Sequence, residues 1–224
     1  MSLTTIDTDN YAEMAKAMGI SGEVSTNSKS KSTLARLKIN HSPVMGIAEV
    51  NKKKVNVEVV EGGTYKLELP DTDQNYFSSE VRIRPYMQRF MHKRFVKGTG
   101  DTKNAFVKTV MADTLNIDLK DNSGKFNCGK SAGYIEDFKA LPEDMQNLIR
   151  QIKRVRVVFG TVQMVDPIDA QGEPVSMDET PFIWEVDNRE SFKIMGDPFK
   201  TLFQNKRLPV QHHISATTVE RKLP

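Results

Sequence analysis

Apolar and polar residues alternate in many short segments between residues 34 and 219, and this period of two restricts the possible folds more than any other feature of the chain. Strands are expected at residues 34–40, 53–60, 65–69, 81–97, 105–112, 115–119, 154–165, 182–187 and 210–219. Gly62 and Gly63 separate the second and third of these segments, which favours a β-hairpin there.

Helices are expected at only a few places: residues 10–18, residues 142–152 and, interrupted by Pro198, residues 191–206. The regular alternation of strands and helices that is typical of a parallel sheet is absent. The sequence therefore predicts an α+β fold, antiparallel and β-rich, built on an OB-fold-like barrel that is elaborated with hairpins and two or three helices. Residues 1–32 are expected to form a short N-terminal helix and a flexible Ser-rich linker, and residues 33–224 a single OB-like domain.

The overall charge is nearly balanced. The 224 residues include 32 Lys and Arg against 29 Asp and Glu, which gives a net charge of +3. This excess is too small to indicate a polyanionic partner, so the distribution of the cations along the chain decides the matter.

Cys128 is the only cysteine, so no disulfide can form within the chain, and a reducing compartment is favoured. No basic segment followed by an apolar stretch begins the chain, and no apolar run approaches the roughly 20 residues of a membrane span. We expect a cytoplasmic protein without a membrane partner, located in the host cytoplasm if it is viral.

Residues 81–97 hold six Lys and Arg residues and His92 but no acidic residue. On a strand, one face would carry Arg82, Arg84, Tyr86, Gln88, Phe90, His92 and Arg94, and the other Val81, Ile83, Pro85, Met87 and Met91. A face that mixes cations with aromatic rings suits single-stranded nucleic acid, because cations contact phosphates and rings stack on unpaired bases.

The candidate binding residues follow from this segment and from neighbouring basic positions. The primary set is Arg82, Arg84, Tyr86, Arg89, Phe90, His92, Arg94 and Lys97. A second set of phosphate contacts is Lys125, Lys130, Arg154 and Arg156.

A structural interpretation of the same segment stays open. In it the aromatic rings lie in the core and the cations are paired with acidic neighbours, for which the candidates are Glu136, Asp137, Glu143 and Asp144. A shift of one residue in register, or a bulge, exchanges the two faces of the strand.

Residues 124–131 fit the phosphate-loop pattern G-x-x-x-x-G-K-[ST]. A true phosphate loop follows a buried parallel strand and begins a helix, and neither is expected here. Asp118 is a weak candidate for a nuclease site, and Cys128 and the four histidines lack the spacing of a zinc site. No catalytic residue, metal or cofactor is expected.

The segment 81–112 with its Arg and aromatic face, and residues 126–138 leading to Arg154-Val-Arg-Val-Val-Phe-Gly, are similar to the single-stranded DNA-binding proteins of tailed phages, which are built on OB-folds. The resemblance implies a non-enzymatic protein that coats single-stranded DNA during phage replication or recombination. Replication or recombination proteins and a second copy of the chain are its further candidate partners. Many such proteins end in an acidic tail, whereas this sequence ends Val-Glu-Arg-Lys-Leu-Pro.

Two alternatives remain. One is an enzyme that processes nucleotides or nucleic acid through the Gly124–Ser131 loop or Asp118. The other is a phage structural or assembly protein whose basic face meets an acidic protein.

Overall fold

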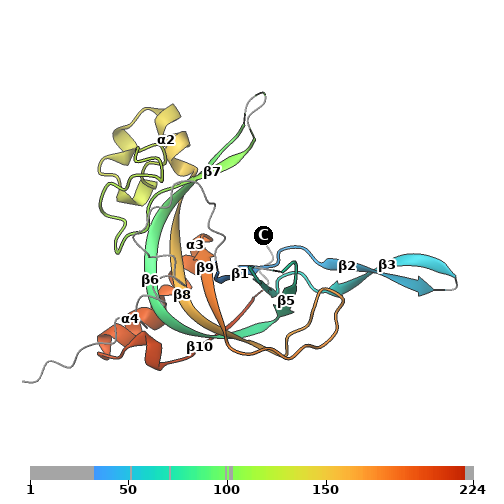
Figure 1. Ribbon diagram of the computed structural model, residues 1–224. Coiled ribbons are helices and arrows are strands. Elements are labelled where there is room, and N and C mark those ends of the chain that lie inside the picture. The colour runs from blue at the N-terminus through green and yellow to red at the C-terminus, as the bar shows by residue number, and fades with distance from the viewer. Residues whose placement is uncertain (1–32, 51, 71, 99, 101–102, 220–224) are drawn as a thin grey trace, which may run out of the picture. The chain divides into compact units, whose positions relative to one another are not determined.

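β-strands make up most of the regular structure in the computed structural model, which describes residues 33–50, 52–70, 72–98, 100 and 103–219. The N-terminal helix and linker expected at residues 1–32 lie outside these ranges. The strands are β1 (Ala35–Ile39), β2 (Val44–Val50), β3 (Lys53–Val60), β4 (Tyr65–Glu68), β5 (Asn75–Ser78), β6 (Glu80–Val96), β7 (Ala105–Lys108), β8 (Ile152–Val165), β9 (Thr180–Val186) and β10 (Ile214–Thr217) (Figure 1).

The helices are few and short. They are α2 (Glu143–Arg150), α3 (Arg189–Ile194) and α4 (Gly196–Gln204), with single 3-10 turns η1 (Ala132–Tyr134), η2 (Phe138–Ala140) and η3 (Pro209–Gln211). Asn188 caps α3, because its side chain accepts hydrogen bonds from the backbone N–H groups of Glu190 and Ser191. The predicted α+β, β-rich class is confirmed.

The main sheet is mixed and has the strand order β10-β6-β8-β9-β1-β4-β5, with β7 paired to β6. β2 and β3 form a separate two-stranded sheet. Within the described part of the chain no sheet closes on itself, so the predicted barrel is not confirmed.

The residues group into two compact units. The first contains the described parts of residues 1–82, 161–183 and 215–224, and the second contains residues 83–160 and 184–214. In the first unit Leu37, Leu67 and Phe182 are completely or almost completely buried. In the second unit a small core is formed by Leu115, Leu119 and Phe192.

The hairpin predicted between residues 53–60 and 65–69 is wrong. β3 pairs with β2, a strand that the sequence did not indicate, and β4 lies antiparallel between β1 and β5. Gly63 donates its N–H to the carbonyl of Asn40, so the glycine turn closes against the end of β1. The buried partners Leu37 and Leu67 then decide the register.

The strand predicted at residues 115–119 is also wrong, since residues 115–117 form bends and residues 118–119 have no regular structure. Leu115 and Leu119 are both buried against Phe192, and it is this core contact that their apolar character reflects. The strand predicted at residues 105–112 ends early, at Lys108.

Pro85 lies in the middle of β6, where it removes one backbone donor. Gly160 of the neighbouring strand β8 faces it at very close range. A Cβ atom added at Gly160 would lie 2.1 Å from the carbonyl oxygen of Arg84 and 2.9 Å from the Cα atom of Pro85. The absence of a side chain at residue 160 is therefore what permits this approach of the two backbones.

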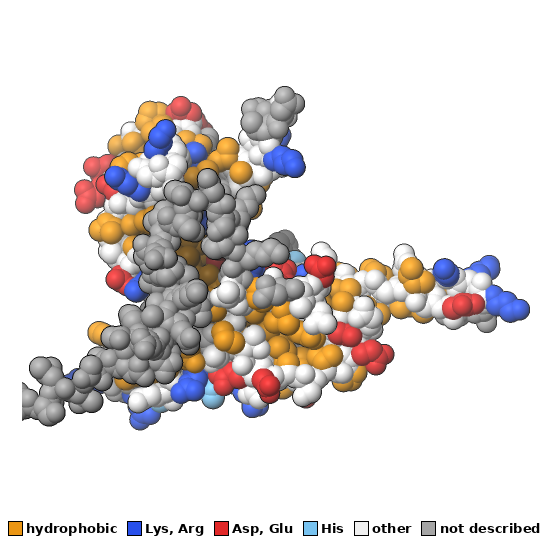
Figure 2. Space-filling view, viewed as in Figure 1, with side chains coloured by type: hydrophobic (Ala, Val, Ile, Leu, Met, Phe, Trp, Pro, Cys, Tyr) orange, Lys and Arg blue, Asp and Glu red, His pale blue; other side chains and the backbone are white. Residues whose placement is uncertain are grey.

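The ribbon of β2 and β3 projects from the rest of the first unit (Figure 1). Figure 2 shows Lys and Arg side chains at its far end, with acidic atoms close beside them, and further acidic side chains nearer its base.

Candidate nucleic-acid interface

The first part of β6 has the predicted faces. Ile83 and Pro85 are buried, whereas Arg84 and Tyr86 point outward, and Tyr86 is 47% exposed. Arg84 donates through Nε to the carbonyl oxygen of Val210 at 2.6 Å, which holds the base of its guanidinium group. Arg82 is exposed and lies 3.8 Å from the carboxylate of Glu80.

The second part of β6 departs from the prediction, and the outward positions expected for Phe90 and His92 are wrong. Phe90 is half-buried against the Leu115–Leu119–Phe192 cluster, with its ring centroid 6.2 Å from that of Phe192. His92 is 0% exposed, although its neighbour Met91 is also buried. Consecutive buried residues mean that β6 is covered on both faces here, which an alternating pattern cannot signal.

His92 is held by the loop that follows β7. Its Nδ1 atom accepts a hydrogen bond from the backbone N–H of Ser131 at 3.3 Å, and its ring meets Tyr134 edge-on. Burial lowers the pKa of His92 below its ordinary value, and the charge of Lys130 acts in the same direction, against a backbone hydrogen bond to Leu115. Folding therefore favours the neutral imidazole of His92 over its protonated form.

We expect the protein to lose stability as the pH falls from 7.5 to 5.5. The unfolded chain binds a proton at His92 below about pH 6.5 while the folded chain resists it, so the free energy of unfolding decreases with a limiting slope of about 1.4 kcal/mol per pH unit. Urea denaturation at the two pH values measures this change. In a His92→Asn variant the free energy of unfolding should depend less on pH than in the wild type. The control His41→Asn, at an exposed position, should keep the pH dependence of the wild type. Equal slopes in all three proteins would contradict the assignment.

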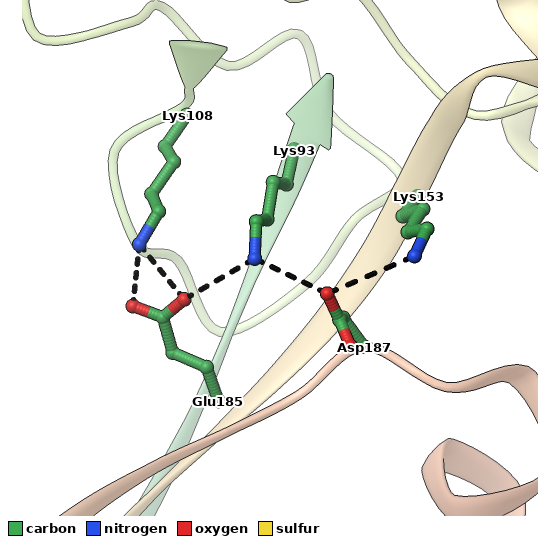
Figure 3. A network of polar contacts seen from close by, with 5 residues as sticks. All are labelled: Lys93, Lys108, Lys153, Glu185 and Asp187. Carbon is green, nitrogen blue, oxygen red and sulfur yellow. Dashed lines mark hydrogen bonds and ion pairs between the residues drawn. The ribbon is translucent and has the colours of Figure 1, made fainter. Parts of the chain in front are cut away.

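Three of the six Lys and Arg residues at positions 81–97, namely Arg82, Arg89 and Lys93, have acidic partners in the described chain, but these are not the acids considered from the sequence. Lys93 lies 3.1 Å from Asp187 and 3.8 Å from Glu185. Lys108 binds Glu185 at 2.6 Å, and Lys153 lies 3.9 Å from Asp187, so that three lysines share two carboxylates (Figure 3). Arg89 pairs with Asp113. In the described chain none of the four acids at residues 136–144 takes part in these ion pairs.

Arg154 and Arg156 are packed against aromatic rings. The guanidinium of Arg154 lies 4.5 Å from the ring centroid of Phe192. Arg156 is only 8% exposed, and it donates to the side chain of Gln88 and to the carbonyl oxygen of Phe192 at 3.3 Å. Burial lowers the pKa of Arg156. The prediction of Arg156 as a phosphate contact is wrong, because its guanidinium is buried and hydrogen-bonded within the protein, to Gln88 of β6 and Phe192 of α3.

The Gly124–Ser131 loop does not have the form of a phosphate loop. Backbone donors at its start point at a carboxylate of the chain itself: Asp121 Oδ1 accepts from the N–H group of Ser123, just before the loop, at 2.8 Å and from that of Lys125 at 3.1 Å. Hydrogen bonds from the Ser123 hydroxyl and then from these N–H groups lower the pKa of Asp121 to about 2. Lys130 binds Asp118 at 2.7 Å, and a single 3-10 turn follows the loop.

Of the remaining candidates, Arg94 is half-buried, whereas Lys97 and Lys125 are exposed. No carboxylate of the described residues lies within ion-pair distance of Lys97 or Lys125. These two cations and Arg84 are therefore the sequence-predicted residues with the best access to a bound phosphate.

The β6–β7 arm, formed by residues 93–97 and 103–108, carries aromatic residues that the sequence did not single out. Phe95 and Phe106 are cross-strand partners, 45% and 54% exposed, and their ring centroids are 5.3 Å apart. Lys93 lies 4.5 Å above the ring of Phe106. The Gly98 N–H donates to Asn104 Oδ1 at the end of the arm. The sequence did contain an indication of this pair, since Phe95 and Phe106 lie at similar distances on either side of the turn that holds Gly98 and Gly100.

Lys97 and Lys103 lie beyond the phenylalanine pair, near the end of the β6–β7 arm, and both are exposed. Neither has an ion-pair partner among the residues that the structure describes. The two exposed rings of the arm thus lie between two pairs of lysines. Lys93 and Lys108 are paired with Glu185 of β9, whereas Lys97 and Lys103 have no ion-pair partner in the described chain.

A further exposed ring lies in the Gly124–Ser131 loop. Phe126 is 58% exposed and lies 5.8 Å from Lys120 Nζ, at the edge of a shallow depression that Val110 and Leu119 also line.

Within the described ranges no group of three or more His, Cys, Asp or Glu side chains is arranged to hold a metal ion. In the same ranges no helix has both the length and the apolar character needed to cross a membrane. Comparison with protein-family models, with curated proteins and with solved structures found no match to this chain.

Proposed function

We propose that this chain is a non-enzymatic single-stranded DNA-binding protein, and that the β6–β7 arm and the exposed residues Arg84 and Tyr86 of β6 form its contact surface. The observation that carries the proposal is the exposed Phe95–Phe106 pair with Lys97 and Lys103 beside it. Two phenylalanine rings in water on a two-stranded arm contribute little to folding, so a ligand with flat apolar faces explains them better.

The distinction between cations with and without a carboxylate partner supports the same contact surface. Arg89, Lys93 and Lys130 are held by carboxylates, and Arg156 is buried. Phosphate contacts are therefore assigned to four exposed cations that have no carboxylate partner in the described chain: Arg84, Lys97, Lys103 and Lys125.

Stacking on exposed rings requires an unpaired base, so a single strand is preferred over a duplex. The proposal does not need a closed barrel, because an open sheet with an arm presents the same side chains. The OB-like barrel remains a hypothesis within the proposal, as do a role in phage replication or recombination, partners from those processes and a cytoplasmic location.

The test is fluorescence anisotropy with a labelled oligo-dT of about 30 nucleotides and a matching duplex as competitor. We expect tight binding of the single strand and weak competition by the duplex. With three to four phosphates neutralised, the log–log salt slope should be about −2 to −3, at about −0.7 for each phosphate. Equal affinity for the duplex would argue against stacking, and absence of binding at low salt would reject the proposal.

An enzyme acting through the Gly124–Ser131 loop is not favoured, because the N–H group of Lys125 donates to Asp121 and the ammonium group of Lys130 is paired with Asp118.

A further inference from the structure

The β2–β3 ribbon has no third strand. Its pairing is regular, with Ile47 opposite Asn56 and Glu49 opposite Lys54, but within the described chain neither strand joins the main sheet. A two-stranded ribbon that stands alone is only marginally stable in water. Both outer edges of the ribbon also keep unpaired backbone groups, which favour association with another chain.

Apolar side chains of the ribbon are exposed. Ile47 is 72% exposed, Met45 54% and Val55 45%. Met45 and Ile47 alternate on one face with Glu49, and their cross-strand partners on that face are Glu58 and Asn56. Apolar groups interspersed with both acidic and basic groups match a protein surface better than they match a polyanion.

The far end of the ribbon is basic. Lys52, Lys53 and Lys54 are consecutive and exposed, and Glu49 faces only the last of them across the strands. Lys52 has a φ angle of 59°, which places it in the turn. We refer to these three lysines as the ribbon tip (Figure 2).

A segment of opposite charge lies at the base of the same ribbon. Residues 161–183 contain five acidic residues and neither lysine nor arginine. Asp166, Glu173 and Asp178 are exposed. A Cβ atom added at Gly172 would lie 3.2 Å from the carbonyl oxygen of Val59, so this segment packs against the base of β3. We refer to residues 166–179 as the acidic segment.

The ribbon tip cannot reach the acidic segment of its own chain. β3 has eight residues, and at about 3.3 Å per residue it carries the tip about 25 Å from the base. This distance exceeds the screening length of about 8 Å at physiological salt. One unit therefore carries a basic end and an acidic end that complement each other only between two molecules.

We propose that the ribbon of one copy docks on the acidic segment of a second copy, with the lysine tip against Asp166, Glu173 and Asp178 and with Met45 and Ile47, which share one face, covered by the contact. The contact joins two different surfaces, so in a docked pair one copy keeps a free acidic segment and the other keeps a free ribbon tip, and the assembly extends as an open chain. Taken with the proposed function, on which this role rests, the contact makes coating of a single strand cooperative. A weak interface suffices, because neighbours on one strand are present at high effective concentration.

The experiment uses sedimentation velocity of the full chain without nucleic acid, at low salt and over a range of protein concentration. The wild type should form a concentration-dependent series of oligomers. Two charge-reversed variants are compared: Lys52→Glu with Lys53→Glu and Lys54→Glu, and Asp166→Lys with Glu173→Lys and Asp178→Lys. Each variant on its own places a tip and an acidic segment of the same charge against each other, so its self-association should be weaker than that of the wild type by about tenfold or more. An equimolar mixture of the two should associate again, because each reversed surface then meets its complement.

The outcomes separate this inference from the proposed function. Restored association in the mixture supports the ribbon contact whether or not the protein binds DNA. A wild type that stays monomeric at all concentrations, or a tip variant that associates like wild type, overturns it. An oligo-dT too short for two copies provides the remaining test: if the tip reversal weakens binding to it as much as to the long strand, the lysines contact phosphates and the proposal is wrong.

Discussion

Replacing Phe95 and Phe106 together by alanine is expected to weaken binding of oligo-dT by about 30-fold or more. Alanine substitution of a stacking ring costs about 1–3 kcal/mol per base, and 1.4 kcal/mol corresponds to a factor of ten. Because the two rings contact each other at 5.3 Å, the double variant removes the whole stacking surface of the arm. Fluorescence anisotropy at fixed moderate salt measures the loss.

The matched control is Phe203→Ala, which removes a ring on α4 that is 84% exposed and lies outside the proposed surface. It should bind as wild type. Thermal melts should show that the double variant remains folded, since both of its rings are half in solvent. If the double variant bound the oligonucleotide as tightly as the control, the arm would not be the interface.

Substitution of Gly160 by alanine is expected to lower the free energy of unfolding by about 3 kcal/mol, at the upper end of overpacking effects. The added Cβ atom would lie 2.1 Å from the Arg84 carbonyl oxygen, and backbone atoms cannot move aside as a side-chain rotamer can. The strands β6 and β8 must then separate locally. Urea denaturation followed by far-UV circular dichroism measures the loss.

Gly133→Ala is the control, because a Cβ atom there meets no atom within 4 Å. Its effect on stability should stay within about 0.5 kcal/mol, as for other surface substitutions. Similar effects at residues 133 and 160 would show that β6 and β8 do not approach as closely as described.

The elements that could be predicted from the sequence are those whose own residues determine them. β6 is a long run with strict alternation from Val81 to Tyr86, and β8 is rich in β-branched residues. α2 begins directly after Pro142 and has acidic residues in its first turn. Trp184 in β9 is buried together with Phe182 and Val186, the positions with which it alternates in the sequence.

The failures have a common physical cause, which is contact between distant parts of the chain. Phe90 and His92 are covered by residues 109–134 and 192, so the face that a strand pattern assigns to solvent is buried. Lys93 finds its carboxylate at Asp187, 94 residues later in the chain, and no local pattern of charge reveals that pair. β2 was missed because Gly46 and Ala48 weaken its alternation, and its strand character depends on pairing with β3.

The same reasoning applies to the stacking residues. Tyr86 was predicted to face outward and does, because its neighbours Pro85 and Ile83 are buried by the sheet. Phe95 and Phe106 come together only through the register of β6 with β7, and that register aligns Lys93 with Lys108. Spacing around the turn at residues 98–100 suggests such a pair but does not determine it.

The carboxylate of Asp121 has a consequence for how loops of this kind are interpreted. In a nucleotide-binding loop the backbone donors converge on an empty place that a phosphate later fills, whereas here the chain supplies the anion itself. The loop is consequently shaped before any ligand arrives, and an approaching phosphate meets a negative charge. Two chains that share all the glycines and the lysine of such a motif can therefore differ completely in what they attract, and the residue that accepts the loop N–H groups decides between them.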